Sequence, residues 1–324
     1  MTLSKPLSKY RNLFINSLFF FITLLVGLAF VEVILRFKNH DQKNYNIEMW
    51  RYAKLLKVKS PDPELGHEHR PHTQAMLEGV MIQINSLGMR GPEPNLSDWA
   101  RKRILVLGSS NTLGWGVPEQ ETLCGLLRKA LADKAQVFNA GIGNYNAHRY
   151  VFLYEKRLQT IKPDIVVIQY FIRDAEDLKP GGGNFILRNS ELAVMLYYLV
   201  HDLSYGYKNP FALVTHYKKM YSAGNPGLES MKSAMQRLNQ LSHQQHFKII
   251  MAMVPDIHAV KPYPFTFIHE SMRNLAASYG WTFVDFSQAL SQVPQKELWV
   301  MNGDPHMNSK GQKIMADTLL PYLA

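Results

Sequence analysis

Two side chains far apart in the sequence, Ser110 and His306, are the residues best suited to covalent chemistry. Ser110 follows an apolar run that ends at Gly108, which places its hydroxyl at the carboxyl edge of a predicted strand, where open α/β sheets bind ligands. A serine hydroxyl needs a base to become a good nucleophile, and the base needs an orienting partner. His306 suits proton transfer near neutral pH, and Asp304 lies two residues before it. The three residues predict a catalytic triad for acyl transfer.

Two other interpretations apply to the serine turn. A serine between a strand and a helix often caps that helix, which would explain Ser110 without any catalysis. The glycine-containing loop 108–114 is also suited to hold a phosphate at a helix start, as in a flavodoxin-like nucleotide binder. His306 favours the nucleophile over the cap, and a phosphate site would leave His306 without a role.

Alternating elements must position these residues. Short apolar runs rich in β-branched residues predict strands that are buried on both faces, at residues 104–107, 137–139, 165–170, 249–254 and 283–284. Helical patterns separate most of them, near residues 121–132, 147–161, 266–279 and 309–322. This alternation predicts an α/β fold with a parallel sheet and helices on both faces. Three candidate site segments directly follow the first three strands, so we expect them at one edge of the sheet.

Four motifs in the same order resemble the SGNH, or GDSL-type, hydrolase family. They are residues 108–110 (GSS), 139–146 (NAGIGNYN), 171–174 (FIRD) and 304–306 (DPH). Residues 84–91 (INSLGMRG) also resemble the segment that precedes the catalytic domain in membrane-anchored bacterial members. The resemblance covers about residues 60–324. It implies a three-layer sheet with flavodoxin-like strand order and a serine esterase with Ser110, His306 and Asp304 as its triad.

The resemblance also implies where an oxyanion would be bound. The family uses the N–H of the nucleophile, the N–H of a glycine after the second strand, and an asparagine side chain after the third strand. The glycine position falls on Asn144, with Gly143 and Gly141 as neighbouring alternatives. The asparagine position is Arg173. Arg173 either serves as a charged oxyanion donor, recognises an anionic group of the substrate, or marks a weakened site.

The chain offers little support for a metal or a cofactor. His67 and His69 are spaced as metal ligands often are, but no further ligand pattern accompanies them, so we expect solvated surface residues. We therefore expect neither a metal nor another cofactor. The single cysteine, Cys124, excludes an internal disulfide and lies in an apolar helical pattern typical of the core.

The charge of the chain bears on its partners. A formal net charge of +10 suits anionic partners such as phospholipid headgroups or acidic glycans. Lysines and arginines are scattered, and no nucleic-acid-binding motif occurs, so nucleic acid is not an expected partner. The sequence does not indicate an oligomeric state.

An apolar segment near the N-terminus predicts a membrane anchor. Residues 13–31 carry no charge, and at ~1.5 Å per residue they can cross a hydrocarbon core of ~30 Å. A cleaved signal peptide is the alternative, with a small-x-small site at 27–29. The apolar pattern continues through 33–35, which favours a retained single-pass span over residues 13–35. Basic residues after the span do not favour export, whereas the resemblance implies a periplasmic or otherwise extracytoplasmic catalytic domain.

These patterns divide the chain into three parts. Residues 1–36 form an N-terminal tail and transmembrane anchor, and residues 37–100 a linker and irregular segment. Residues 101–324 form an SGNH-like hydrolase domain, interrupted by a helical insert at about 180–235. The insert is either a cap over the site, a membrane-contacting element or an extra packed helix, and the last is the simplest interpretation.

The functional prediction is a serine-dependent esterase or O-acyl transferase that acts on carboxylic esters. Its substrate would include O-acetyl groups of an envelope glycan, and nothing in the chain decides between hydrolysis and transfer. The alternative is a catalytically weakened SGNH-fold protein that serves as a binding or assembly component of envelope polysaccharide. The substitution at Arg173 motivates this alternative.

Overall fold

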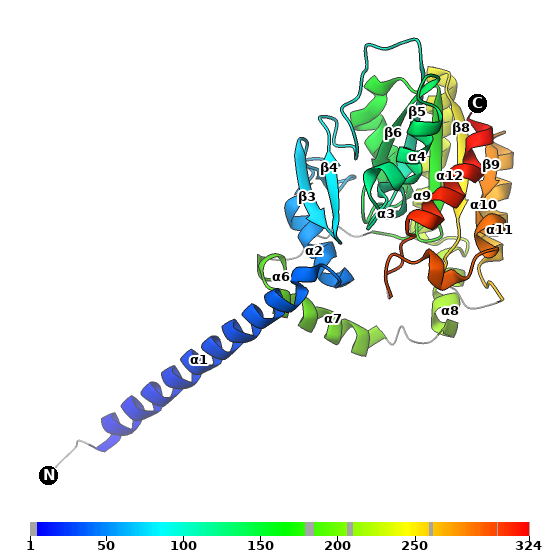
Figure 1. The fold of residues 1–324 in the computed structure, drawn as a ribbon. Coiled ribbons are helices and arrows are strands. Elements are labelled where there is room, and N and C mark those ends of the chain that lie inside the picture. The colour runs from blue at the N-terminus through cyan, green and yellow to red at the C-terminus, as the bar shows by residue number, and fades with distance from the viewer. Residues whose placement is uncertain (1–4, 179–184, 206–209, 259–261, 303, 324) are drawn as a thin grey trace.

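A five-stranded parallel sheet forms the centre of the molecule, in the order β6-β5-β7-β8-β9 (Figure 1). The computed structural model describes residues 5–178, 185–205, 210–258, 262–302 and 304–323 of the 324-residue chain. The strands are β5 (Lys102–Gly108), β6 (Ala135–Gly141), β7 (Ile165–Phe171), β8 (Lys248–Val254) and β9 (Thr282–Asp285). By chain position the order is 2-1-3-4-5, which confirms the predicted flavodoxin-like sheet.

Each strand of this sheet coincides with one of the predicted apolar runs. Successive side chains of β5 enter two different cores, with Leu105 and Leu107 in one and Ile104 and Val106 in the other. All four are fully buried. A strand that is covered on both faces needs apolar residues at every position, which is why these runs show no alternation of polar and apolar residues.

Helices cover both faces of the sheet and complete three layers. Residues of α5 (Ala147–Leu153), α9 (Pro226–Gln245) and α10 (Thr266–Ser278) join one core. Residues of α4 (Leu123–Ala130), α11 (Ser287–Ser291) and α12 (Ser309–Leu319) join the other. Single turns of 3₁₀ or π helix are η1 (Asn39–Asp41), η2 (Glu119–Glu121), η3 (Tyr154–Leu158), η4 (Gln159–Ile161), η5 (Gln295–Leu298) and η6 (Leu320–Tyr322). The predicted α/β class with helices on both faces is confirmed.

Helix α9 belongs to the sheet layers, although it was not among the predicted helices. It starts at Pro226 and so begins within the predicted insert, whose first residues (180–184) lie outside the described residues. The side chain of Asn225 caps it, accepting main-chain N–H bonds of the first turn. Its buried stripe contains Met231, Met235 and Leu238 at helical spacing. The rest of the helix is polar, which obscured this stripe in the sequence.

The segment that connects the N-terminal helix to the sheet, residues 37–100, contains both helical and stranded structure. It contains α2 (Tyr45–Leu55) and two antiparallel hairpins. The hairpin strands are β1 (Lys57–Lys59), β2 (His67–His69), β3 (Thr73–Leu77) and β4 (Val80–Ile84). Their apolar side chains form a small core with Leu113 and Trp115 from the sheet domain. This connecting segment therefore packs on the edge of the sheet domain where β5 ends.

A long helix, α1 (Lys5–Lys38), projects from the rest of the molecule (Figure 1). Its segment Tyr10–Asp41 has an apolar window with a mean hydropathy of 2.7, long and apolar enough to cross a membrane, and none of that window is buried. Beside the C-terminal end of α1 lie α6 (Phe185–Asn189) and α7 (Glu191–Tyr205), and α8 (Pro210–Met220) follows. These three helices belong to the predicted insert.

Candidate active site

Ser110, His306 and Asp304 lie in direct hydrogen-bond contact. The Oγ atom of Ser110 is 2.7 Å from Nε2 of His306, and Nδ1 of His306 is 2.6 Å from Oδ1 of Asp304. The same Oδ1 accepts the main-chain N–H of His306 at 2.7 Å. Because Nδ1 donates to Asp304, Nε2 carries the lone pair that accepts the serine proton. The structure brings the three predicted residues together in the order that a serine nucleophile requires.

Ser110 opens the short helix α3 (Ser110–Leu113) immediately after β5. Glycines at the ends of two strands let this helix approach the sheet. A Cβ atom on Gly108 would lie 2.1 Å from Oγ1 of Thr112, and one on Gly141 would lie 2.2 Å from the main-chain nitrogen of Leu113. The tight turn therefore directs the serine hydroxyl to the triad histidine, where it does not cap the helix.

His306 is fixed from several directions. The adjoining residue, Met307, pairs with Trp299 in an isolated bridge, and Asn308 caps α12. His306 is 4% exposed, so its ring is largely shielded from water. The rings of Tyr45 and Trp115 lie 5.8 and 6.2 Å from the His306 ring, measured between centroids. Tyr45 of α2 and Trp115 of the sheet domain thus form an aromatic wall beside His306.

The end of β6 and the loop after it contain the three residues predicted as alternative backbone donors to the oxyanion, and their hydrogen bonds distinguish them. The N–H of Gly141 donates to Oδ1 of Asn139 at 3.0 Å. The N–H of Gly143 donates to the hydroxyl of Tyr52 at 2.9 Å. Asn144 is exposed and has φ 63°, a left-handed conformation that asparagine tolerates better than most residues. Since both glycine N–H groups are occupied, the N–H of Asn144 remains the candidate donor of this loop.

Side chains from the connecting segment hold this loop in place. The carbonyl of Gly143 accepts hydrogen bonds from Nζ of Lys57 at 2.7 Å and Nε2 of His67 at 3.0 Å. The carbonyl of Asn144 accepts a bond from Arg149 at 3.3 Å. Burial, with the Arg149 charge nearby, lowers the pKa of Lys57 to about 7. The loop is therefore clamped at both of its central peptide groups.

A relay of hydrogen bonds extends from the Gly143 N–H into the core. Tyr52 donates its hydroxyl to Nε2 of His69 at 2.6 Å, and Nδ1 of His69 donates to the Gly88 carbonyl at 2.9 Å. This pattern requires a neutral His69, and burial lowers its pKa to about 3. Burial likewise lowers the pKa of His67 to about 2. Our expectation that these histidines are solvated surface residues was wrong, because both support the loop.

Arg173 follows β7 at the same sheet edge but does not join the triad. Its guanidinium pairs with Oε2 of Glu176 at 2.7 Å, and its side chain is 55% exposed. Tyr45 and Tyr217 are its other electrostatic neighbours. The aspartate that follows, Asp174, is buried and accepts the N–H of Phe171. In this conformation Arg173 is neutralised by Glu176, at the side of the site that Tyr45 lines.

A second carboxyl group, that of Glu78, lies beside Asp304. Glu78 stands in the turn between β3 and β4 with φ 48°, and its N–H donates to Glu48 at 3.0 Å. Both of its carboxyl oxygens are buried without a hydrogen-bond partner among the described residues, and so are Oδ2 of Asp304 and Nε1 of Trp115. Burial and the negative charge of Asp304 raise the pKa of Glu78 to about 9. The raised pKa of Glu78 favours its protonated form, which can donate a hydrogen bond toward the unpartnered oxygen of Asp304.

Sequence reasoning missed Tyr45, Tyr52 and Glu78. Their local sequence shows no motif, and they reach the site only through packing of the connecting segment. The two-residue turn at Glu78-Gly79, between alternating strands, was the available signal for a hairpin, and it says nothing about where the hairpin docks.

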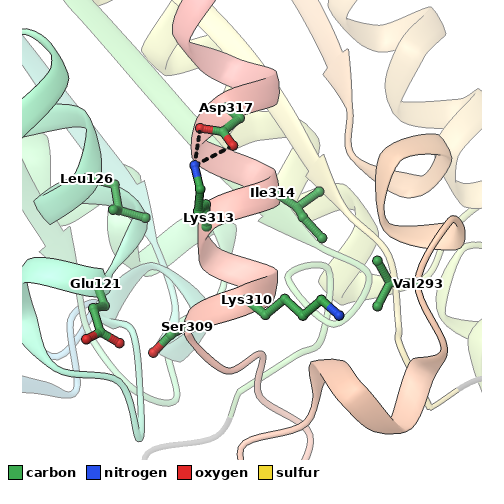
Figure 2. Close-up of a pocket in the computed structure, with 8 residues that line it drawn as sticks. All are labelled: Glu121, Leu126, Val293, Ser309, Lys310, Lys313, Ile314 and Asp317. Atoms are coloured by element: carbon green, nitrogen blue, oxygen red, sulfur yellow. Dashed lines mark hydrogen bonds and ion pairs between the residues drawn. The ribbon is translucent and has the colours of Figure 1, made fainter.

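A surface pocket elsewhere in the molecule is distinct from this site. It lies along α12, and Figure 2 shows the ion pair between Lys313 and Asp317 on its wall. The lining residues are Glu121, Leu126, Val293, Ser309, Lys310, Lys313, Ile314 and Asp317. None of them belongs to the triad or the oxyanion loop. Among the described residues, no group of three or more His, Cys, Asp or Glu side chains is placed to hold a metal ion.

Comparison with known proteins agrees with this geometry. A model of the GDSL-like lipase/acylhydrolase family matches residues 106–314, more than half of the chain. No curated protein matches the sequence.

Two solved structures are similar to part of this chain. One is a lipolytic protein of the G-D-S-L family from Desulfitobacterium hafniense, with 14% identity and a TM-score of 0.45, covering 68% of this chain and 99% of that chain. Another is a catalytic mutant of an acetylxylan esterase from Geobacillus stearothermophilus, with 18% identity and a TM-score of 0.45, covering 69% of this chain and 94% of that chain.

Proposed function

Because the chain belongs to the GDSL-like lipase/acylhydrolase family, we propose that it is a serine-dependent esterase or O-acyl transferase acting on carboxylic esters. The observation that carries this proposal is the unbroken set of contacts from Ser110 through His306 to Asp304. The reacting groups are within hydrogen-bond distance before any substrate binds, so proton transfer requires no rearrangement.

The first half-reaction transfers the acyl group to the enzyme. Nε2 of His306 takes the hydroxyl proton as Oγ of Ser110 bonds to the acyl carbon, and the carbonyl electron pair moves onto oxygen. Asp304 stabilises the imidazolium that forms. The tetrahedral intermediate collapses, the ester C–O bond breaks, and the departing alkoxide takes the proton from His306. The products are the alcohol and an acyl ester of Ser110.

The second half-reaction regenerates Ser110. His306 deprotonates an acceptor hydroxyl, which attacks the acyl carbon, and the proton then returns to the serine oxygen. Water as acceptor gives hydrolysis, and a sugar hydroxyl gives acyl transfer.

Two backbone N–H groups are the donors that we assign to the oxyanion in both half-reactions. Ser110 opens α3, and the first N–H groups of a helix have no partner within it. The N–H of Asn144 is the second donor, in a loop whose carbonyls are held by Lys57 and Arg149. Arg173 is occupied by Glu176 and contributes no direct donor in this arrangement.

The proposed substrates are O-acetyl esters of an envelope glycan, which would reach a catalytic domain held outside the cytoplasm by a retained α1. The apolar pattern that continues past residues 27–29 through 33–35 supports retention. The end of the helix is joined to the folded part, where Nη2 of Arg36 donates to the Asn189 carbonyl at 2.6 Å and Asn39 donates to Glu191 at 2.8 Å. Protease treatment of spheroplasts tests the orientation. A domain that stays protected until lysis would place it in the cytoplasm and contradict the envelope-glycan substrate.

A second function is a weakened member of the family that binds or assembles envelope polysaccharide. The pairing of Arg173 with Glu176 favours it, because the side chain at the position of the family's third oxyanion donor is engaged elsewhere. Turnover of p-nitrophenyl acetate by the detergent-solubilised full chain separates the two. We expect turnover by the wild type and its loss in Ser110→Ala. An inert wild type that Arg173→Asn activates would establish the weakened member.

A further inference from the structure

The outward face of α6 and α7 is apolar and exposed to solvent. Its exposed side chains, which we call the α7 face, are Phe185, Ile186, Met195, Leu196 and Leu199, and their exposed fractions run from 39% to 80%. The spacing of Met195, Leu196 and Leu199 places them on one side of α7. The opposite side contains Val194, which is buried, and Tyr197, which is 45% exposed. Such a face is unusual on a soluble domain and is typical of a surface that contacts another apolar phase.

The start of α7 is tied to a carboxylate at the end of the apolar run. Oε1 of Glu32 accepts the N–H of Glu191 at 3.1 Å. Oε2 of Glu32 accepts the N–H of Leu192 at 3.0 Å and the hydroxyl of Ser190 at 2.9 Å. An acidic side chain at a helix N-terminus satisfies free N–H groups and interacts favourably with the helix dipole. Glu32 of α1 therefore caps the first turn of α7.

This cap fixes the depth of α7 relative to a membrane. The uncharged run 13–31 rises ~28 Å at 1.5 Å per residue, close to the ~30 Å thickness of a hydrocarbon core. Glu32 follows that run and lies in the last turn of the predicted span 13–35, so we expect the first turn of α7 near the boundary between hydrocarbon and headgroups. Apolar faces of interfacial helices are buried at this level.

Polar contacts and charge complete the junction. Arg51 donates to Glu191 at 2.6 Å, which holds α7 against α2, and Nζ of Lys54 donates to the side chain of Asn189, the last residue of α6, at 2.9 Å. Arg36, Lys38 and Lys43 follow Glu32 by four, six and eleven residues. Basic side chains at this level attract anionic phospholipid headgroups.

From these observations we propose that the α7 face rests on the lipid surface beside α1, as a second and interfacial membrane contact. The occupant is the phospholipid bilayer itself. Tyr198 of α7 is an electrostatic neighbour of Tyr45, and the ring of Tyr45 lies beside that of His306. The proposed membrane contact therefore lies next to the catalytic site. The catalytic site would then be held close to the membrane surface by two helices.

Spin labels on the full chain test this proposal without requiring catalytic activity. Single copies are reconstituted in nanodiscs of phosphatidylethanolamine and phosphatidylglycerol, and a nitroxide is attached to Leu199→Cys. Relaxation by oxygen, which enters lipid, is compared with relaxation by a water-soluble nickel chelate. Asp133→Cys, in an exposed loop before β6, is the matched control. The native Cys124 is buried, so unmodified protein gives the background.

We expect oxygen to relax the Leu199 label more than nickel does, with the reverse at Asp133. Equal or greater nickel access at Leu199 would overturn the proposal. A label shielded from both reagents would also overturn it, because protein would then cover the face. Adding Glu32→Ala should abolish the oxygen preference while α1 still anchors the chain, and an unchanged preference would contradict the cap as the element that sets the depth.

Discussion

The edge of the sheet and the connecting segment (residues 37–100) build the site in different ways. The sheet edge supplies the triad. Ser110 follows the end of β5, and Asp304 and His306 lie in the loop before α12. The connecting segment supplies Tyr45, Tyr52 and Glu78, which touch the triad or its oxyanion loop from outside. Reacting groups are thus placed by secondary structure, and their surroundings by packing over long sequence distances. Substitutions in the two regions should differ in kind as well as in size.

The largest effect is expected within the triad. His306→Ala should lower kcat for p-nitrophenyl acetate about 10⁴- to 10⁶-fold, because the serine loses its base. Ser110→Ala should lose a similar factor, and the double mutant little more, because the members act as a unit. Steady-state kinetics on the solubilised full chain measures this. Additive losses of kcat in the double mutant would show that the two residues act independently. The sheet edge would then not supply a single catalytic unit.

A smaller effect is expected from the connecting segment at Tyr52. Tyr52→Phe removes the hydroxyl that accepts the Gly143 N–H, so the oxyanion loop loosens and kcat should fall up to about 100-fold. The buried N–H left unpaired should also lower the free energy of unfolding by about 1–3 kcal/mol.

Tyr154→Phe provides a matched control for this substitution. Tyr154 is as buried as Tyr52, and its hydroxyl donates to Gln245. In the part of the chain that the structure describes, Gln245 does not contact the triad or the oxyanion loop. It should lose comparable stability without losing kcat. Equal kcat in Tyr52→Phe and Tyr154→Phe would show that the connecting segment supports only the fold.

Arg173 should show a modest effect. Its charge is exposed and already paired with Glu176, so Arg173→Ala should change kcat little. For an anionic ester, KM should rise about two- to fivefold, the size expected for an exposed ion pair. Comparison of a neutral with a carboxylated ester of the same leaving group measures it. A fall in kcat of about 100-fold or more with both esters would instead identify Arg173 as an oxyanion donor.

The effect of Glu78 should be small at neutral pH and appear only in alkali. Its pKa is raised to about 9, so the wild type should lose activity as pH rises through that value and a second negative charge forms beside Asp304. Glu78→Gln keeps a neutral donor at this position and should remove the loss of kcat at alkaline pH. The other neighbours of the Glu78 side chain are Glu48 and Trp115. If Glu78→Gln loses kcat at alkaline pH as the wild type does, another group causes that loss.

Stability should follow the same proton. The folded protein keeps a proton on Glu78 that the unfolded chain releases above the ordinary value of 4.5, so the free energy of unfolding falls as pH rises from about 4.5 to about 9. Burial also raises the pKa of Asp174, to about 8, with the same sign. Because Asp174 is present in both proteins, the difference in thermal unfolding between wild type and Glu78→Gln isolates Glu78.

The sequence predicted the parts of the molecule that depend on local pattern. Buried parallel strands need continuous apolar runs, so all five strands were found at their observed places. The place of Ser110 follows from the rule that the carboxyl ends of such strands share one edge. His306 and Asp304 lie in the loop before α12, and the need of a serine for a base, together with the family resemblance, pointed to them. The long apolar helix was equally evident from composition.

Long-range packing was beyond the same reasoning. Nothing near Glu78 indicates that its turn docks beside Asp304, and nothing near Tyr52 indicates a bond to Gly143. His69 looked polar and therefore exposed, yet two hydrogen bonds satisfy its ring in the core. A buried polar residue depends on partners that local sequence does not identify.

The central claim is that His306 activates Ser110 as the nucleophile. Labelling of the solubilised full chain with a fluorophosphonate probe, followed by mass analysis of its peptides, tests it most directly. We predict one adduct on Ser110, formed far more slowly in His306→Ala and absent in Ser110→Ala. An adduct on another residue, or labelling of Ser110 at the same rate without His306, would contradict the account.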